Sequence, residues 1–206
     1  MLTLNNELPP KNQLIIGALH DLMVAGNTLE SVTVSQIAAK AGIGKGTIYE
    51  YFSCKEDIFR EAVIAASIYH LKNMFGILES GKSYKCTQTE MADYILRIIH
   101  KNKIFFEYLL KGFDSGSEYR FCEIGRDFIN TYKDDISRLV NDLIQKGIDE
   151  GAISSMPDQN KIEFASFSAL SYLIYCKPGE EGIFGSVYSE EEIRELCCEM
   201  FTKIIC

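Results

Sequence analysis

The chain has 206 residues, of which 47% are hydrophobic, and a formal net charge of −8 at pH 7. This length and apolar content are enough for a packed core and exclude global disorder. The amino-terminal residues lack the apolar core of a signal peptide, and the most hydrophobic stretch, residues 164–176, is too short to cross a bilayer. We therefore expect a cytoplasmic protein without a membrane partner.

Composition also predicts the fold class, which is all-α. Proline is scarce, at 4 residues, and the apolar residues repeat at helical rather than strand spacing. The 7 cysteines show no Cys-x-x-Cys pair and no nearby histidine in sequence, so we predict neither a metal site nor a cofactor. They are interpreted as reduced, packed thiols. The carboxyl-terminal group Cys197, Cys198 and Cys206 leaves redox sensing open as an alternative.

The first two predicted helices are marked by clear start and stop signals. The Pro9–Pro10 pair opens the first helix, and Gly26 ends it. Thr33, with Gln36 three residues later, forms a capping box that starts the second helix. Gly42 then ends this helix after only a few turns. Two short helices joined in this way are typical of a compact helical domain.

A third short segment follows the glycine turn and separates its side chains into two faces. Ile48 and Phe52 are spaced to face inward, which leaves polar side chains outward. Ser53 and Glu56 form another predicted capping box, with Lys55 in the first turn of the helix that begins there. Free backbone N–H groups at a helix start favour an anion such as phosphate. The pattern is typical of a helix-turn-helix that reads DNA.

In this region the chain resembles the TetR family of bacterial transcriptional repressors. The resemblance covers roughly residues 10–65 and is carried by Ile37-Ala38, Ala41-Gly42, Gly46-Thr47-Ile48-Tyr49, Tyr51-Phe52 and Ser53-Cys54-Lys55-Glu56. It implies a helix-turn-helix DNA-binding domain over residues 1–54 and a helical effector-binding and dimerisation domain over residues 55–206. It also implies DNA contacts through Thr33, Lys45, Gly46, Thr47, Tyr49, Tyr51 and Lys55.

Two residues depart from the pattern of the resembled family. Gly44 stands where the family often has serine, and Glu50 places a carboxylate where the reading helix meets DNA. Glu50 either accepts a hydrogen bond from a cytosine amino group or points away from the duplex, and the sequence leaves both open. Residues 40–55 hold 3 basic and 1 acidic side chain. We therefore expect few phosphate contacts per subunit and an affinity that needs two subunits.

The remaining helices are expected in the following chain order. The helix that begins at Ser53 extends to about residue 80, and a helix capped by Thr87 and Glu90 follows. Next come residues 101–110, a long helix over 118–150, and a helix from Pro157 to residue 176. Ser189 and Glu192 cap the final helix.

The last two predicted helices are richer in apolar residues than one buried stripe requires. In the resembled family these helices pack against a second subunit as a four-helix bundle. Packing into the monomer core is the alternative for one of the two faces. The resemblance implies a homodimer interface made of Phe167, Leu170, Ile174, Ile193, Leu196, Cys197, Met200, Phe201 and Ile204.

Aromatic residues of the second domain form the predicted lining of an effector cavity. Acidic anchors among them, Glu107 or Glu123, would suit a lipophilic cation, and His100 is a further polar anchor. Plain core packing is the alternative for each aromatic, and the sequence names no effector. The predicted pocket consists of His100, Phe105, Phe106, Tyr108, Phe128, Tyr132, Phe164 and Phe167.

These features predict a ligand-responsive transcriptional regulator, most simply a repressor. Its predicted partners are a pseudo-palindromic double-stranded DNA operator, a second copy of the chain and an unknown small-molecule effector that releases it. A dimeric helical module that has lost specific DNA binding is the alternative. A nucleotide-binding enzyme is disfavoured because residues 42–47 lack the spacing of a phosphate loop, and a thiol enzyme because nothing local activates a cysteine. We therefore expect no enzyme activity.

Overall fold

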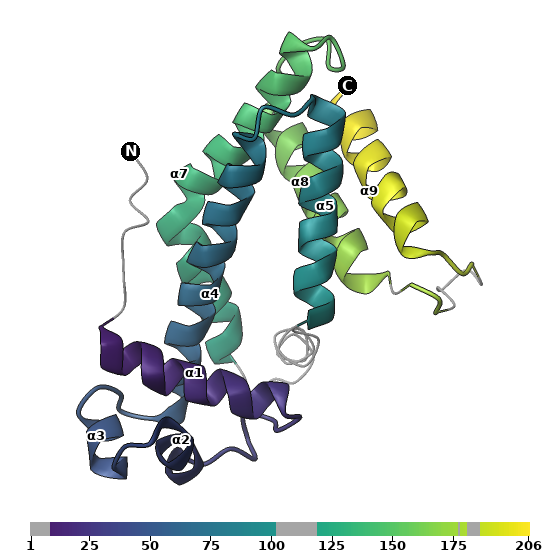
Figure 1. The fold of residues 1–206 in the computed structure, drawn as a ribbon. Helices are drawn as coiled ribbons and strands as arrows, with labels where there is room; N and C mark the ends of the chain where they lie inside the picture. Colours follow the sequence, from purple (N-terminus) through teal and green to yellow (C-terminus); the bar gives the residue numbers. More distant parts are fainter. Residues whose placement is uncertain (1–8, 102–118, 177, 181–185) are drawn as a thin grey trace. The chain divides into compact units, whose positions relative to one another are not determined.

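The structure is a computed structural model that describes residues 9–101, 119–176, 178–180 and 186–206, with side chains between 101 and 129 outside the description. Helices are the only regular elements longer than one residue in these ranges (Figure 1), which confirms the all-α prediction. They are α1 (Pro10–Val24), α2 (Val34–Ala41), α3 (Lys45–Tyr49), α4 (Lys55–Leu78), α5 (Tyr84–Lys101), α7 (Tyr119–Asp149), α8 (Gln159–Tyr175) and α9 (Glu190–Ile205).

Contacts divide the described chain into two compact units. The first holds residues 9–72 and 119–133, and the second holds residues 73–101 and the described residues from 134 to 206. The division between the units falls inside α4, after Lys72, whereas the sequence-based prediction placed a domain boundary between residues 54 and 55. Because α4 is one continuous helix, its first residues belong to the first unit and its last residues to the second.

Helices α1, α2 and α3 and the start of α4 share one apolar core in the first unit. Helix α1 packs on α2, and α2 packs on α3 (Figure 1). Long side chains that are fully enclosed, including Phe59 at the start of α4, fill the space between these helices. The core consists of Ile15, Ala18, Leu19, Met23, Leu29, Val32, Ile37, Ala38, Ala41, Ile48, Phe52, Ile58, Phe59 and Val63.

The predicted signals around α2 are confirmed. The Gln36 amide donates to the Thr33 hydroxyl at 3.2 Å, and the Thr33 amide donates to the Gln36 side-chain oxygen at 2.8 Å. Gly42 ends α2 with a φ of 68°, a left-handed conformation that favours glycine. The next start differs from the prediction because α4 begins at Lys55, two residues after Ser53.

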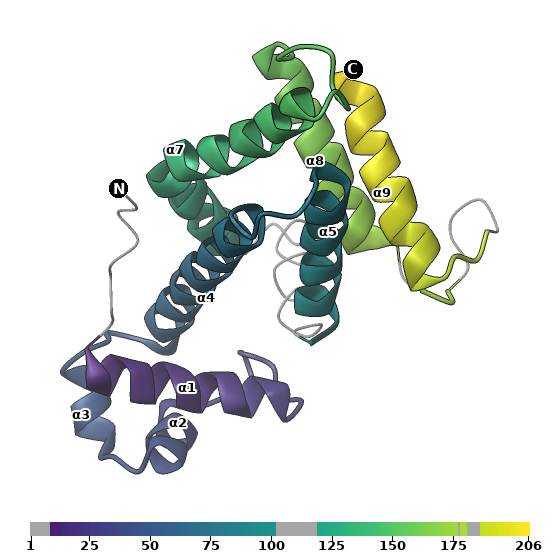
Figure 2. The same ribbon diagram turned by 45° about the horizontal axis from the view of Figure 1, so that its top comes forward.

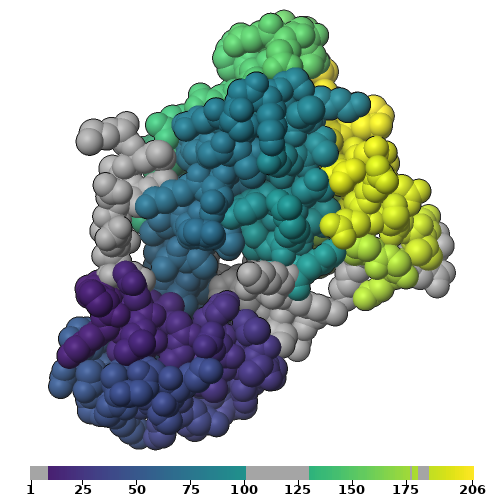
Figure 3. Space-filling model, in the orientation of Figure 1, coloured from purple at the N-terminus to yellow at the C-terminus, as the bar shows by residue number. Residues whose placement is uncertain are grey.

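Helices α5, α8 and α9 lie side by side in the second unit (Figures 1 and 2). The surfaces of α5 and α9 adjoin on the face that Figure 3 shows. One buried cluster joins these helices and consists of Ala92, Leu96, Leu173, Ile193 and Cys197. An ion pair between Arg194 of α9 and Asp93 of α5, at 3.0 Å, adds a polar tie across the same packing.

Helix α5 begins one turn earlier than predicted, so the predicted start at Thr87 is wrong. The amide of Tyr84 donates to both carboxylate oxygens of Glu150, at 2.9 and 2.8 Å. An acidic side chain at a helix start satisfies a free N–H group and complements the helix dipole. This cap comes from the residue directly after α7, and no local sequence signal could predict it. Thr87 is buried inside the helix.

The other predicted helix ends agree with the structure to within two residues. Ser189 and Glu192 form the expected capping box at the start of α9. Helix α8 begins after Asp158, whose carboxylate accepts a hydrogen bond from the Lys161 amide at 3.0 Å. The predicted helix over residues 101–110 lies almost wholly outside the described residues. None of the helices in the described ranges is long and apolar enough to span a bilayer.

Candidate nucleic-acid interface and effector cavity

The turn between α2 and α3 presents a short helix with one buried and one exposed face. Gly44 precedes α3 in an extended conformation, and Ile48 is enclosed in the core of the first unit. This anchor leaves Lys45, Gly46 and Tyr49 exposed and Thr47 half-buried. The structure therefore gathers four of the predicted DNA-contacting residues on one segment of five residues.

Two exposed tyrosines on this surface each lie next to a lysine ammonium group. Tyr49 is 52% exposed and its ring centroid lies 5.8 Å from the Nζ of Lys45. Tyr51 is 40% exposed and its ring centroid lies 5.7 Å from the Nζ of Lys11. Tyrosine is suited to such a partly exposed position, because its ring packs on the protein while its hydroxyl group contacts water. The arrangement offers phenol and ammonium donors together, which suits a phosphate backbone.

Lys11 was missed by the sequence prediction. It lies on α1, far in sequence from the segment around α3, and only the packing of α1 brings it to Tyr51. No local pattern marks such a lysine. Lys40, the next basic residue on α2, instead forms an exposed ion pair with Asp21 at 3.4 Å.

Thr33 and Glu50 flank this surface. Thr33 is exposed, and its hydroxyl donates to the Gln36 side-chain oxygen at 2.9 Å while it accepts the Gln36 amide. The hydroxyl proton is therefore engaged in the cap of α2. Glu50 is exposed directly after α3, and both alternatives for this carboxylate stay open.

Lys55 occupies a different environment from Lys45. Its Nζ donates to the backbone carbonyl oxygens of Leu29 at 2.6 Å, Glu30 at 3.0 Å and Val32 at 3.0 Å. An ammonium group has three N–H donors, so these three bonds use all of them. The structure thus gives Lys55 a role inside the first unit that the sequence did not indicate.

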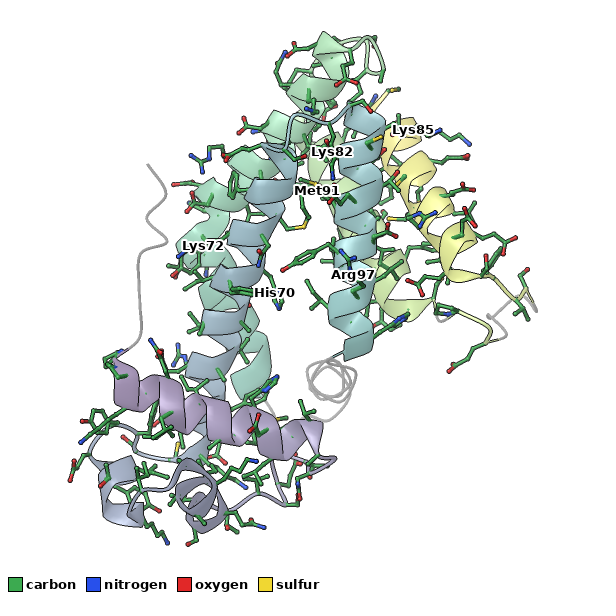
Figure 4. All side chains as sticks on the ribbon, viewed as in Figure 1. His70, Lys72, Lys82, Lys85, Met91 and Arg97 are labelled. Carbon is green, nitrogen blue, oxygen red and sulfur yellow. The ribbon has the colours of Figure 1, made fainter. Side chains whose placement is uncertain are left out.

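The second unit contains a cavity of about 140 Å³, partly open to solvent, between the end of α4 and helices α5, α7, α8 and α9. Its walls are mostly apolar and include Met74, Met91, Leu139, Leu173 and Phe201. None of the described residues that line it is charged. Figure 4 shows Met91 on α5, with Lys82 and Lys85 near the amino-terminal end of that helix.

The polar side chains at the cavity wall are already bonded within the protein. The Gln88 amide nitrogen donates to the Cys198 carbonyl at 3.0 Å and to the Thr202 hydroxyl at 3.2 Å. The Ser166 hydroxyl donates to the Ile162 carbonyl at 2.8 Å. These donors would have to give up a bond to reach a ligand, so the cavity is suited to an apolar group.

The predicted pocket residues are only partly described. Phe105, Phe106 and Tyr108 lie outside the described residues, as does the side chain of Phe128. His100 is exposed and Tyr132 is half-buried. Phe164 and Phe167 are 64% and 72% exposed, and neither lines the cavity.

The predicted dimer residues divide into three groups. Phe167, Leu170 and Leu196 are exposed, whereas Ile193, Cys197 and Phe201 are buried within the unit. Ile174, Met200 and Ile204 are half-buried. The exposed members belong to α8 and α9, the two helices that make the most extensive contact with each other.

Burial keeps the neighbouring thiols Cys197 and Cys198 protonated. It raises the pKa of Cys197 to about 12 and that of Cys198 to about 11. Because the thiolate is the reactive form, both groups are poor nucleophiles at neutral pH. No cluster of three or more His, Cys, Asp or Glu side chains that could hold a metal ion occurs in the described part of the chain.

Comparison with known proteins links this geometry to a group of bacterial proteins. Residues 26–62 match the family model described as "Bacterial regulatory proteins, tetR family". The matched segment contains α2, α3 and the start of α4. No curated protein sequence matches the chain.

Solved structures share the fold at low sequence identity. The fatty acid degradation regulator FadR from Bacillus halodurans is 16% identical, has a TM-score of 0.65, and the alignment covers 97% of both chains. FadR from Bacillus subtilis in complex with stearoyl-CoA is 18% identical, with a TM-score of 0.61 and coverage of 94% of this chain and 97% of that one. A TetR/AcrR-family regulator from Thermobifida fusca is 17% identical, with a TM-score of 0.65 and coverage of 94% and 97%.

Proposed function

We propose that the chain, whose residues 26–62 match the tetR family of bacterial regulatory proteins, is a member of that family and a ligand-responsive transcriptional repressor. It binds a pseudo-palindromic DNA operator as a homodimer and is released by a small-molecule effector. Residues 1–54 form the DNA-binding domain, and residues 55–206 bind the effector and the second subunit. The proposal rests on one observation: Lys45 and Tyr49 lie next to each other and are exposed, whereas Ile48 of the same helix is buried in the core.

The proposed DNA contacts come from α3 and the residues around it. Lys45 and Lys11 supply charge next to phosphate, and Tyr49 and Tyr51 supply hydroxyl donors above rings that are partly packed. Thr47 faces the groove, where its methyl group can contact thymine, and Gly46 lets the backbone approach closely. Phosphate contacts fix the position of the helix, and the groove contacts select the sequence.

Anisotropy titration tests the proposal with a duplex from the upstream region of the gene and a scrambled duplex of the same composition. We expect the upstream duplex to bind more tightly. Lys45→Met should flatten the slope of log affinity against log salt by about 0.9 per subunit, because one phosphate contact is lost. Lys203→Met on α9 is the matched control and should leave the slope unchanged. Equal affinity for both duplexes would instead support the alternative, a dimeric helical module that has lost specific DNA binding.

Dimerisation is proposed through the exposed apolar face of α8 and α9. Phe164, Phe167, Leu170 and Tyr175 on α8 and Leu196 on α9 are exposed. Large apolar side chains gathered on one face favour burial against a partner. A second copy of the chain is the proposed partner, since a two-fold axis would then present two reading helices to successive major grooves about 34 to 36 Å apart.

The proposed effector carries an uncharged apolar part that enters the cavity of the second unit. No charge among the described lining residues would neutralise a cation there, so this site does not favour the lipophilic cation considered from the sequence. The thioethers of Met74 and Met91 adapt to apolar groups of different shape. One structural neighbour is named a fatty acid degradation regulator, and the structure of a second, also named FadR, is a complex with stearoyl-CoA. We therefore propose a fatty acyl compound.

The effector releases the operator only through a difference in its affinity for the two states of the protein. Helix α4 provides Met74 to the cavity wall and Phe59 to the core of the first unit. A ligand that moves Met74 would therefore act on a helix that also belongs to the DNA-binding core.

The effector proposal is tested by adding stearoyl-CoA, or free fatty acids of increasing chain length, to the preformed operator complex. Release is expected to rise with chain length until the cavity is filled, because each buried CH₂ contributes about 0.8 kcal/mol. Ala169→Phe fills the cavity and should abolish release while operator binding persists. Ala152→Phe, at an exposed position outside the cavity, is the control. Release that is independent of chain length and unaffected by Ala169→Phe would contradict the proposal.

A further inference from the structure

The side chain of Lys55 connects the start of α4 to the loop between α1 and α2. Three backbone carbonyl oxygens, from Leu29, Glu30 and Val32, converge on its Nζ at 2.6 to 3.0 Å. Hydrogen bonds to a charged donor are shorter and stronger than neutral ones. The loop and the first residue of α4 are therefore tied together through the backbone as well as through the apolar core.

The loop leads directly into the helices of the proposed DNA-binding surface. Val32, the last of the three acceptor residues, is followed by Thr33, which caps α2. The apolar side chains of Leu29 and Val32 are both 1% exposed, so they anchor the loop on the core side. Within the loop, the amides of Ser31 and Val32 donate to the Thr28 carbonyl. The position of α2, and with it α3, thus depends on where the loop is fixed.

We propose that Lys55 is a positioning residue, which fixes the loop ahead of α2 through its three carbonyl acceptors and acts on DNA only through the placement of α2 and α3. This inference rests on the proposed DNA binding. It differs from the role implied by the TetR resemblance, in which the same lysine contacts phosphate. With all three donors engaged, Lys55 has to break a bond before it can donate to a phosphate oxygen.

Substitution by arginine separates the two roles. An arginine keeps the positive charge and binds phosphate at least as well as a lysine, so a phosphate contact would survive Lys55→Arg. A planar guanidinium cannot direct three N–H groups from one nitrogen at three converging carbonyls. For a positioning residue, Lys55→Arg should therefore weaken operator binding nearly as much as Lys55→Met.

The experiment compares Lys55→Arg and Lys55→Met with Lys45→Met in the full-length protein. Operator affinity is measured at several salt concentrations, and hydrogen exchange of the segment 28–36 is followed without DNA. We expect both Lys55 variants to lose about tenfold or more in affinity, since several charge-assisted hydrogen bonds are lost. The salt slope should stay as in the unmodified protein. Exchange in segment 28–36 should accelerate, while exchange in α9 is unchanged.

Two outcomes would overturn the inference. A salt slope flatter by about 0.9 per subunit in Lys55→Met, with unchanged exchange, would show a direct phosphate contact. Full affinity of Lys55→Arg would show that charge alone is needed. If the unmodified protein fails to bind its operator, the proposed function fails, whereas the exchange measurement still decides whether Lys55 fixes the loop. If Lys55→Met does not fold, Lys55→Arg provides both measurements.

Discussion

The amino-terminal and carboxyl-terminal parts of the chain differ in how completely they bury their apolar side chains. The core around α1, α2 and α3 encloses Ile15, Leu19, Ile37 and Ile48 almost completely, and its exposed aromatics are tyrosines with polar tips. Helix α8 instead leaves Phe164 and Phe167 exposed, and both α8 and α9 border an apolar cavity. The first core is closed by its own residues. The second unit has apolar surface left for a partner and apolar space left for a ligand.

The variant with the largest expected effect lies in the second unit, at Gly147, where neighbouring side chains are as closely packed as in the first core. A Cβ at Gly147 in α7 would lie 2.6 Å from Ile153 Cδ1 and 3.1 Å from Tyr84 Cδ2. We expect Gly147→Ala to destabilise the fold by about 1–3 kcal/mol through overpacking, measured by denaturant unfolding. Gly76→Ala in α4 is the control, because nothing lies within 4 Å of its Cβ. It should raise stability by about 0.5–1 kcal/mol. If the two variants changed the free energy of unfolding equally, the side chains around Gly147 would not be closely packed.

A second variant tests whether the exposed face of α8 is an interface. Phe167→Glu places a charge at a side chain that is 72% exposed in the single chain. It should leave folding of the chain intact and weaken self-association by at least about tenfold, because a charge would be buried without a partner. Sedimentation over a range of concentrations measures this. Met156→Glu, exposed but outside α8 and α9, should not change association. If Phe167→Glu self-associated as strongly as the unmodified protein, the exposed face of α8 would not be an interface.

The smallest expected effect distinguishes the caps of α2 and α9. Hydrogen bonds from the Ser189 amide and hydroxyl lower the pKa of Glu192, whereas Gln36 in the equivalent position of α2 does not titrate. A carboxyl group with a lowered pKa in the fold stabilises it above its ordinary pKa. That contribution is lost as the pH falls through the lowered pKa. Unfolding of the unmodified protein between about pH 7 and pH 3 should therefore be more acid-sensitive than that of Glu192→Gln. Identical acid profiles would remove the cap of α9 as a source of pH dependence.

The sequence-based predictions were correct where the interacting residues lie close together in the sequence and failed where they lie far apart. Capping boxes at Thr33 and Ser189 and the glycine end of α2 were predicted correctly because the partners lie within a few residues of each other. The start of α5 was placed one turn too late because its cap, Glu150, follows α7 and lies 66 residues further along the chain. The same reason explains why Lys11 was missed: its place next to Tyr51 depends on how α1 packs.

The helical class, the helix-turn-helix segment and the resemblance of that segment to the tetR family could be predicted from the sequence alone, since these depend on local spacing, caps and a fixed run of residues. Only the tertiary structure decided that Lys55 binds three carbonyl groups, that Phe167 is exposed while Phe201 is buried, and that uncharged residues surround the cavity. The physical reason is that burial and hydrogen-bond partners are set by which helices meet. A pattern of apolar residues along one helix shows that it has an apolar face, but not which neighbour covers that face.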